Sequence, residues 1–266
     1  MVVNQEIIQA INILGRFCGK RDIKALTSLE LEKSFGISQV DIMVLFGGSV
    51  LAGGDVLANA MENKIARRYV IVGGRGHTTE TLCQQMEKEI SSLQTEGLSE
   101  AELFNSYLQN IYGKKADWLE TKSTNCGNNV TYLLELLKEK MEDWSSILIC
   151  QDATMQLRME AGLKKYIATD KRVINFAAYQ AEVRLQEGVP VYQSQIHGMW
   201  EVDRYVQLLM GEIPRLTDDQ NGYGPEGKNF ISHVDIPEEV QKAFERLKKE
   251  NEGLVRIANP LYASKQ

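Results

Sequence analysis

The sequence predicts an α/β fold, with a three-layer, Rossmann-like parallel sheet, helices on both faces, and a smaller helical, turn-rich C-terminal region. Short apolar runs alternate with segments long enough to form helices, which is typical of right-handed βαβ units. Paired glycines end two of these runs, at 47–48 and 73–74. All five prolines follow residue 189, so turns are expected to gather in the last part of the chain.

The 266 residues are enough for one or two domains, at about 150 residues per domain, and for a sizeable core without disulfides. We expect a helical lead-in over 1–38 and a Rossmann-like domain over 39–180. A C-terminal region over 181–266 is expected to pack on or near the ligand site.

The first elements follow from hydrophobic periodicity. Apolar side chains at spacings of three and four predict an N-terminal helix: Ile7, Ile11, Leu14 and Cys18. Residues 21–38 are mixed in character and are expected to be helical or irregular. The apolar run 40–46 suits a strand that is buried on both faces of a parallel sheet.

The alternation continues with a helix predicted over 54–67 and a second strand over 69–72. Ser99 and Glu102 form a capping box, in which each side chain bonds the backbone N–H of the other residue. This box predicts a helix that runs to about Tyr112.

The later elements are predicted in the same way. They are a short strand at 118–119, a helix over 127–141, a strand over 147–150, a helix over 153–167, a strand over 172–178, a helix over 199–211, a turn-rich stretch over 212–236 and a final helix over 237–250.

Charge and cysteine content narrow the function classes. The net charge is −6 and no long run of Lys or Arg occurs, so nucleic-acid binding is not expected. The four cysteines form no CxxC pair and are expected to be free thiols in a reducing compartment. The sequence shows neither a signal peptide nor an apolar run near the roughly 18 residues of a membrane span. We therefore expect a cytoplasmic protein without a membrane segment.

Polar or glycine-rich clusters stand at the ends of successive strands or the starts of the helices between them. They are Gly47-Gly48-Ser49, residues 73–79 (GGRGHTT), residues 123–129 (STNCGNN) and residues 151–158 (QDATMQLR). Ligands of open parallel sheets bind beyond the carboxyl ends of the strands, where helix N-termini attract anions. One glycine pair alone would indicate only a tight turn, but four such clusters together predict a binding site.

Common fingerprints of enzyme families are missing. No GxGxxG follows the first strand, and the second strand ends in glycine rather than in an acid that would bind a ribose. The sequence also has no P-loop and no GxSxG elbow. A simple dinucleotide dehydrogenase, a class I methyltransferase, a P-loop enzyme and an α/β-hydrolase therefore receive little support.

The sequence also gives little support to a metal site. His77, His197 and His233 have no ligand spacing to one another, and Asp152 and Glu120 are the carboxylates that a divalent ion would use. Cys126 stands near a predicted helix start, but no base is placed beside it, so we expect a structural or hydrogen-bonding role.

Taken together, these motifs resemble the bacterial YdcF/SanA/ElyC family, a domain of unknown function. The resemblance rests on the glycine pairs, residues 99–101, Glu120 with 123–129, and 152–158. The tail is similar to the YdcF branch in GMWEVDRY (198–205), GEIPRL (211–216), Asp219, GYGP (222–225) and HVD (233–235). The similarity spans about residues 4–250.

The resemblance implies a Rossmann-like fold and, for the YdcF branch, S-adenosylmethionine as a ligand without an established reaction. Some relatives are anchored in the membrane, whereas this sequence lacks their membrane segment. The family usually has Glu-Asn where this chain has Asn128-Asn129, and many members have His-Met in place of Thr154-Met155. Both departures weaken a hydrolytic role.

Our leading hypothesis is that the protein binds a nucleotide-like, anion-bearing small molecule, with S-adenosylmethionine as the first candidate. The expected ligand-binding residues are Gly47, Gly48, Ser49, Gly73, Gly74, His77, Ser123, Thr124, Asn125, Asn129, Thr154, Met155 and Arg158. The glycines would admit the ligand, residues 123–125 would hydrogen-bond it, and Arg158 would pair with its anion. Trp200 and Tyr223 would cover the site.

Glu100 and Asp152 are the catalytic candidates. Glu100 would reach a ribose hydroxyl or act as an acid or base, although a carboxylate in a first helical turn is equally explained by the helix dipole. Two rival hypotheses remain. One is a hydrolase or transferase that acts on a phosphate ester or diphosphate bond with a divalent metal, and the other is a non-catalytic sensor or assembly protein with a partner at 212–236.

Overall fold

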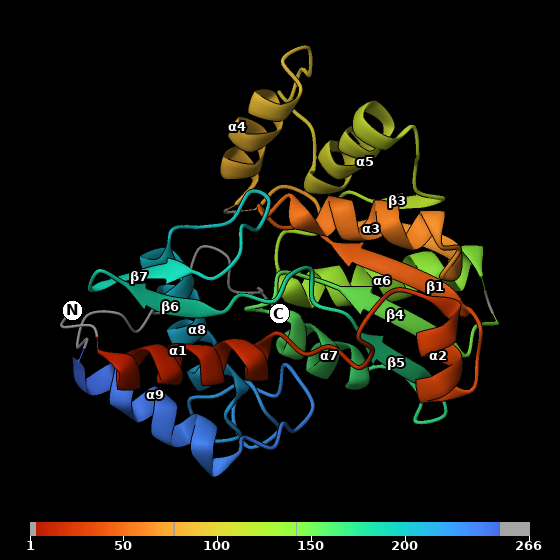
Figure 1. Cartoon of the computed structure of the whole chain (residues 1–266). Helices are drawn as coiled ribbons and strands as arrows, with labels where there is room; N and C mark the ends of the chain where they lie inside the picture. The colour runs from red at the N-terminus through yellow and green to blue at the C-terminus, as the bar shows by residue number, and fades with distance from the viewer. Residues whose placement is uncertain (1–3, 77, 142, 251–266) are drawn as a thin grey trace.

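The computed structural model, which describes residues 4–76, 78–141 and 143–250, confirms the predicted fold class. Five parallel strands form a sheet in the order β3-β2-β1-β4-β5 (Figure 1). The strands are β1 (Val40–Phe46), β2 (Ala66–Val72), β3 (Trp118–Glu120), β4 (Ser146–Cys150) and β5 (Arg172–Asn175).

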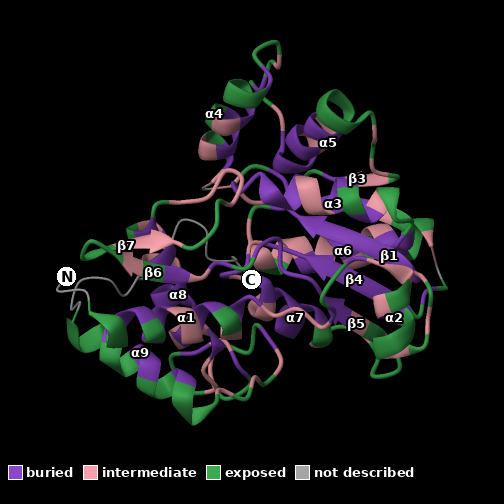
Figure 2. Cartoon of the chain, viewed as in Figure 1, coloured by how far each residue is buried: buried purple, intermediate pink, exposed green. Residues whose placement is uncertain are grey.

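β1 is the central strand and is buried along its whole length, as its continuous apolar sequence predicts (Figure 2). Its residues alternate between two apolar clusters, with Val44 on one face of the sheet and Met43 and Leu45 on the other. In the register of the sheet, Val44 stands opposite Val70 of β2 and Ile149 of β4.

Helices cover both faces of the sheet. On the face of Met43 lie α3 (Ala52–Glu62) and α5 (Glu100–Tyr112), and α4 (Thr79–Glu89) packs against α5. The face of Val44 is covered by α6 (Cys126–Lys140) and α7 (Gln156–Lys164), through apolar side chains such as Val130 and Met159. The sheet therefore forms the middle of three layers, as expected.

The first and last parts of the chain meet beside the sheet. α1 (Gln5–Cys18) packs against α8 (Val202–Leu216), α9 (Glu238–Glu250) and the first strand of the hairpin β6–β7 (Figure 1). β6 (Val183–Gln186) and β7 (Val189–Tyr192) pair antiparallel. The short helix α2 (Ser28–Phe35) lies between α1 and β1 in the sequence.

The capping box is confirmed. Ser99 Oγ accepts from the backbone N–H of Glu102 at 3.2 Å, and Glu102 Oε2 accepts from the backbone N–H of Ser99 at 2.8 Å. The other predicted helices and strands are also present, with ends that differ by a few residues from those expected.

The helix predicted over 54–67 is too long, because α3 ends at Glu62 and β2 already begins at Ala66. Lys64 has a positive φ of 52°, which stops the helix before the strand. Arg67 and Arg68 are exposed in the first half of β2, so this half does not have the apolar sequence of a buried strand.

Three further features differ from expectation. α4 and the β6–β7 hairpin were not predicted, and α8 runs to Leu216 instead of ending near 211. Pro214 lies in the last turn of α8, where the Arg215 side chain donates to the Gly211 carbonyl. Pro214 has no N–H to bond the Met210 carbonyl, but only Arg215 and Leu216 follow it in the helix, so the missing bond falls at the end of α8.

Candidate functional site

The carboxyl ends of β1 and β4 form a topological switch point. The two strands are neighbours, but the chain leaves β1 toward α3 on one face and leaves β4 toward α7 on the other. Open α/β sheets bind their ligands in the crevice that such a divergence creates. Here the crevice brings together two of the predicted clusters, residues 47–49 and 151–154.

The crevice is narrow. A Cβ added to Gly48 would lie 3.5 Å from Gln151 Oε1. A pocket of about 10 Å³, which is room for about one water molecule, is lined by residues that include Gly48, Gln151, Asp152 and Phe104. A nucleotide-sized ligand therefore requires the crevice to open further.

Two buried polar groups at the crevice have no hydrogen-bond partner in the part of the chain that the structure describes. Ser49 and Gln151 are each 1% exposed, and Ser49 Oγ and Gln151 Nε2 find no hydrogen bond within the described residues. An unpaired buried donor or acceptor costs about 1–3 kcal/mol, and almost all such groups in proteins are paired. These two are the groups that a polar ligand or an ordered water would satisfy.

Glu100 fills the space beside the glycine pairs. Its backbone N–H donates to the Gly74 carbonyl at 3.0 Å, so that α5 begins against the end of β2. A Cβ on Gly47 would lie 2.5 Å from Glu100 Oε2, and one on Gly73 would lie 3.1 Å from the Glu100 Cβ. The close approach of Glu100 thus explains why glycine stands at 47 and 73.

The Glu100 carboxyl is buried and polar contacts hold one of its oxygens. Oε1 accepts from Thr78 Oγ1 at 3.0 Å and from Thr79 Oγ1 at 2.9 Å. Burial raises the pKa of Glu100, and the two threonine hydrogen bonds offset part of this effect. A raised pKa favours the protonated form of this carboxyl more than in an exposed glutamate.

The Ser123 and Glu120 side chains anchor the loop after β3. Ser123 Oγ accepts from the Gly74 N–H at 3.2 Å, and Glu120 Oε1 accepts from the Lys122 and Ser123 N–H groups at 2.6 and 3.0 Å. The second oxygen of Glu120, Oε2, is buried and has no partner among the described residues. This loop lies against the end of β2 and holds a further unpaired acceptor.

Residues 124–129 serve the start of α6. Asn125 Oδ1 accepts from the Asn128 N–H at 3.0 Å, and both Thr124 and Asn125 donate to Asn128 Oδ1, at 3.3 and 2.8 Å. Asn129 begins the helical ladder by bonding the Asn125 carbonyl. Cys126 is partly buried against the apolar cluster on this face of the sheet.

Asp152 holds the turn between β4 and α7. Its Oδ1 accepts from the Thr154 N–H at 2.8 Å, from Thr154 Oγ1 at 2.7 Å and from the Tyr179 hydroxyl at 2.8 Å. Thr154 is buried, and Met155 is half-buried just before α7. These bonds explain the Asp152 side chain as an anchor of the turn.

Arg158 points to a protein carboxylate. Its Nε lies 2.5 Å from Glu212 Oε2 and its Nη2 lies 3.1 Å from Glu212 Oε1, with side-chain exposures of 12% and 6%. The predicted partner of Arg158 was the anion of a ligand, but α8 supplies Glu212 in that place.

The segment 193–201 covers the N-terminal end of α3 next to the crevice. The Ala52 N–H donates to the His197 carbonyl at 3.1 Å, and Gln85 Nε2 donates to the Gly198 carbonyl at 3.2 Å. Trp200 belongs to this segment, and its buried Nε1 has no partner in the described part of the chain. Tyr223 instead packs against Phe230 in the stretch after α8, with ring centroids 5.2 Å apart.

The sequence did not single out the contacts of His197, which fasten this segment. Nδ1 lies 2.8 Å from Asp55 Oδ2, and Nε2 lies 3.2 Å from Glu89 Oε1. Asp55 Oδ1 in turn accepts from the hydroxyls of Tyr107 and Tyr112, at 2.6 and 2.8 Å. Burial alone would lower the pKa of His197, but the carboxylates of Asp55 and Glu89 raise it.

Stability should therefore depend on the charge of His197. Folding raises its pKa above the unfolded value of 6.5, so its contribution is fully present below that pH and is lost as pH rises through the folded-state pKa. We expect the difference in unfolding free energy between the protein and its His197→Gln variant to shrink above pH 6.5, as measured by urea unfolding over a pH series. A difference that stays constant to pH 9 would contradict the ion pairs.

His77 lies outside the described residues. Within the described ranges, no group of three or more His, Cys, Asp or Glu side chains is arranged to hold a metal ion, and no helix is long and apolar enough to cross a membrane. A scan against models of known protein families found no match.

Proposed function

We propose that this protein binds a nucleotide-like, anion-bearing small molecule at the carboxyl ends of β1 and β4. The observation that carries the proposal is a pair of buried polar groups at the switch point, Ser49 Oγ and Gln151 Nε2, which have no hydrogen-bond partner among the described residues. They stand where sheets of this topology place their ligands. S-adenosylmethionine is the first candidate because of the resemblance to the YdcF branch, and the free cysteines fit a cytoplasmic location.

One of the two helices that flank the crevice, α7, supports an anionic ligand group. α5 and α6 have their first N–H groups capped by Ser99 and Asn125, and the first N–H groups of α3 bond the carbonyls of His197, Val50 and Leu51, whereas α7 has no side-chain cap. Uncapped N–H groups at a helix start attract negative charge by roughly 0.3–1 kcal/mol. Glu100, beside the end of β1, is placed to accept from a ligand hydroxyl.

Binding requires the crevice to open, because it now has room for about one water molecule. The segment 193–201 lies next to the crevice and is held by the Ala52, Gln85 and His197 contacts and by the apolar side chains of Ile196, Met199 and Trp200. We propose that it lifts to admit the ligand and that Trp200 then contacts the ligand.

The test is a titration of the protein and its Ser49→Ala variant with S-adenosylmethionine, followed by calorimetry and thermal unfolding. Because Ser49 Oγ is unpartnered, we expect Ser49→Ala to leave the ligand-free protein as stable as before or more stable by about 1 kcal/mol. Affinity for the ligand should fall about tenfold, as for one lost hydrogen bond. Gln151→Glu keeps the Oε1 acceptor and replaces the Nε2 donor, so it should also lower ligand affinity, but because it buries a carboxylate beside Asp152 we expect it to destabilise the ligand-free protein as well.

Ser92→Ala is the matched control, because Ser92 is exposed in the loop after α4. S-adenosylhomocysteine, ATP, nucleotide sugars and prenyl diphosphates complete the ligand panel, each with and without Mg²⁺. Ligand affinity that is unchanged in both Ser49→Ala and Gln151→Glu would place the binding site elsewhere. If no member of the panel shifts the unfolding temperature, the proposal of a nucleotide-like ligand is wrong.

A hydrolase or transferase acting on a phosphate ester or diphosphate is the second candidate. The buried, unpartnered Oε2 of Glu120 and the raised pKa of Glu100 favour it, because such carboxyls suit metal binding or proton transfer. It predicts Mg²⁺-dependent turnover of a diphosphate in the same panel, and loss of that turnover in Glu120→Gln. Ligand binding without any turnover would instead favour the non-catalytic sensor.

A further inference from the structure

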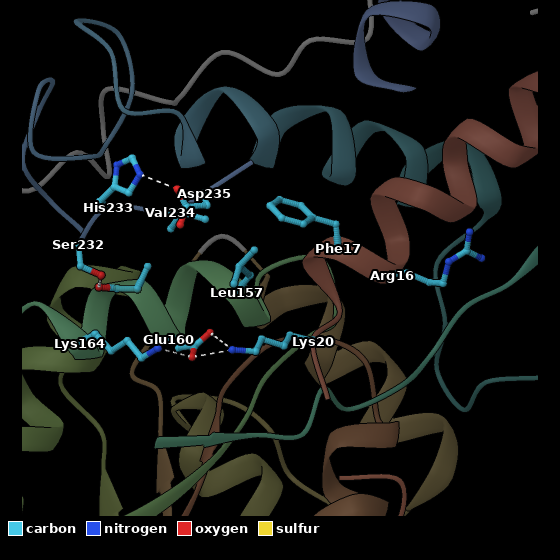
Figure 3. Close-up of a pocket in the computed structure, with 11 residues that line it drawn as sticks. Arg16, Phe17, Lys20, Leu157, Glu160, Lys164, Ser232, His233, Val234 and Asp235 are labelled. Atoms are coloured by element: carbon cyan, nitrogen blue, oxygen red, sulfur yellow. Dashed lines mark hydrogen bonds and ion pairs between the residues drawn. The ribbon is translucent and has the colours of Figure 1, made fainter. Parts of the chain in front are cut away.

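A second hollow lies on the side of α7 that faces α1. It has a volume of about 470 Å³ and lies between the C-terminal half of α1, α7 and residues 232–235 (Figure 3). This volume is within the roughly 300–1,000 Å³ of small-molecule sites. None of the residues of the β1–β4 crevice line it, so it is a separate site.

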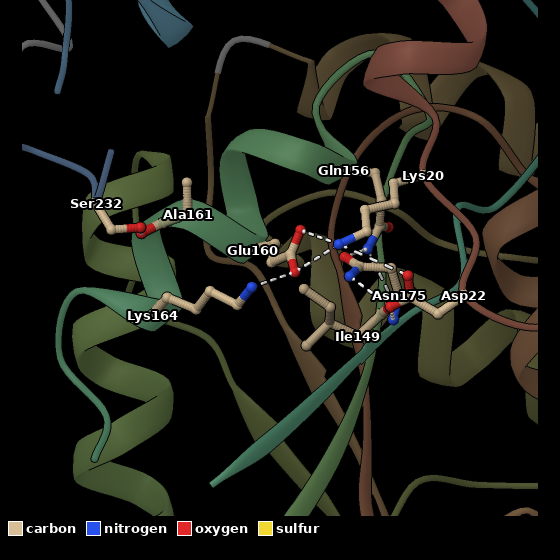
Figure 4. A network of polar contacts seen from close by, with 9 residues as sticks. All are labelled: Lys20, Asp22, Ile149, Gln156, Glu160, Ala161, Lys164, Asn175 and Ser232. Carbon is tan, nitrogen blue, oxygen red and sulfur yellow. Dashed lines mark hydrogen bonds and ion pairs between the residues drawn. The ribbon is translucent and has the colours of Figure 1, made fainter. Parts of the chain in front are cut away.

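One side of this pocket carries two cations and one anion. The ammonium groups of Lys20 and Lys164 each lie 2.8 Å from Glu160 Oε1, and Glu160 is 5% exposed (Figure 4). The nearby Asp22 is 3.6 Å from Lys20, does not line the pocket, and accepts from Asn175 through its other oxygen. We call Lys20, Glu160 and Lys164 the positive end of the pocket.

The opposite side carries the imidazole of His233 and the carboxylate of Asp235, and Asp218 lies behind His233 without lining the pocket. His233 Nδ1 lies 2.6 Å from Asp218 Oδ2, and His233 Nε2 lies 3.1 Å from Asp235 Oδ1. Hydrogen bonds to Asp218 and Asp235 raise the pKa of His233, which favours its charged form. Because Asp218 offsets the charge of His233 from behind, Asp235 is the carboxylate that this side presents to the pocket, and we call His233 and Asp235 the negative end.

Apolar side chains separate the two ends. Phe17 from α1, Leu157 from α7 and Val234 line the pocket, and Figure 3 shows Leu157 between the Lys20–Glu160–Lys164 group and the His233–Asp235 pair. A molecule with one charge would use a single end and would also meet a like charge there, from Glu160 or from His233. A molecule with both charges would use both ends, and an apolar body would lie on the wall between them.

We propose that this pocket binds a zwitterion with an apolar body, of the class of free amino acids with large apolar side chains or short apolar peptides. The carboxylate of the ligand lies toward Lys20 and Lys164, its ammonium lies toward Asp235, and its side chain packs on Phe17 and Leu157. This proposal does not depend on the function proposed for the β1–β4 crevice.

Calorimetric titration of the whole protein with L-phenylalanine, L-leucine and the dipeptide Phe-Leu tests the proposal. N-acetyl-L-phenylalanine lacks the ammonium, and L-phenylalanine amide lacks the carboxylate. We expect each derivative to bind about two- to fivefold more weakly than phenylalanine, as for the loss of one solvent-exposed ion pair. Asp235→Asn should weaken phenylalanine but not its N-acetyl derivative, and Lys164→Gln should weaken phenylalanine but not its amide.

Lys24→Gln is the control, because Lys24 is exposed and does not line the pocket. Both test positions are largely exposed, at 51% for Lys164 and 100% for Asp235, so the variants should fold. If phenylalanine, leucine and Phe-Leu all give no heat of binding, the proposal is wrong. Equal affinity for phenylalanine and both of its derivatives would also overturn the proposal. If the Ser49→Ala variant no longer binds phenylalanine, the ligand lies in the β1–β4 crevice and the proposal is wrong as well.

Discussion

Replacing Glu212 with leucine is expected to lower the free energy of unfolding by about 3–5 kcal/mol, as for a buried ion pair that loses one partner. The Glu212 carboxylate holds Arg158 through two hydrogen bonds and lies 3.7 Å from Arg215, and both guanidinium side chains are at most 14% exposed. Without Glu212, these two positive charges would stay buried without a carboxylate. Urea unfolding followed by circular dichroism measures the loss.

The double variant Glu212→Leu with Arg158→Met should recover most of this stability, because an apolar pair can replace a buried ion pair at little cost. The matched exposed pair is Glu238–Lys242 on α9, whose side chains are 79% and 72% exposed. Lys242→Met should change stability by less than about 1 kcal/mol. A loss in Glu212→Leu no larger than the loss in Lys242→Met would show that water screens the buried pair.

Gly74→Ala is expected to destabilise the protein by about 2–3 kcal/mol and to disturb the loop after β3. The new Cβ would stand 2.2 Å from the Ser123 carbonyl oxygen and 2.9 Å from the Lys122 carbonyl carbon, so backbone would have to move. That movement would also break the hydrogen bond between the Gly74 N–H and Ser123 Oγ. Thermal and urea unfolding measure the change in stability.

Gly76→Ala is the control for this prediction. Its Cβ would lie 3.6 Å from the Thr124 carbonyl oxygen, which is an ordinary contact. If Gly76→Ala and Gly74→Ala lose the same stability, the general cost of replacing glycine in this loop explains both, and the close approach of Ser123 does not.

The sheet could be predicted because burial on both faces gives an uninterrupted apolar run, as in β1 and β4. The first half of β2 lacked this pattern, since Arg67 and Arg68 face solvent there. In the β6–β7 hairpin, Glu187 and Gly188 both have positive φ, at 53° and 79°, which is the turn that a tight two-residue loop needs. The Glu-Gly pair between VRLQ (183–186) and VPVY (189–192), in which apolar residues stand at alternate positions, was the available indication.

The location of the candidate site was also predictable, because the carboxyl ends of parallel strands must share one edge of the sheet. The partner of each side chain was not. Arg158 pairs with Glu212, and His197 pairs with Asp55 and Glu89, and in each case the partners are far apart in the sequence. Helical packing brings them together, and local periodicity carries no information about it. The pocket between α1 and α7 arises in the same way.

The packing of α1 against α9 has a consequence for protein synthesis. The apolar face of α1, which includes Ile7, Ile11 and Leu14, belongs to the same core as Phe244 and Leu247 near the other end of the described chain. While the ribosome is still making the intervening residues, this face has no α9 to cover it. The packing of α1 against α9 must then wait until α9 has been made, and until that step the newly made N-terminal helix is a surface that chaperones would bind.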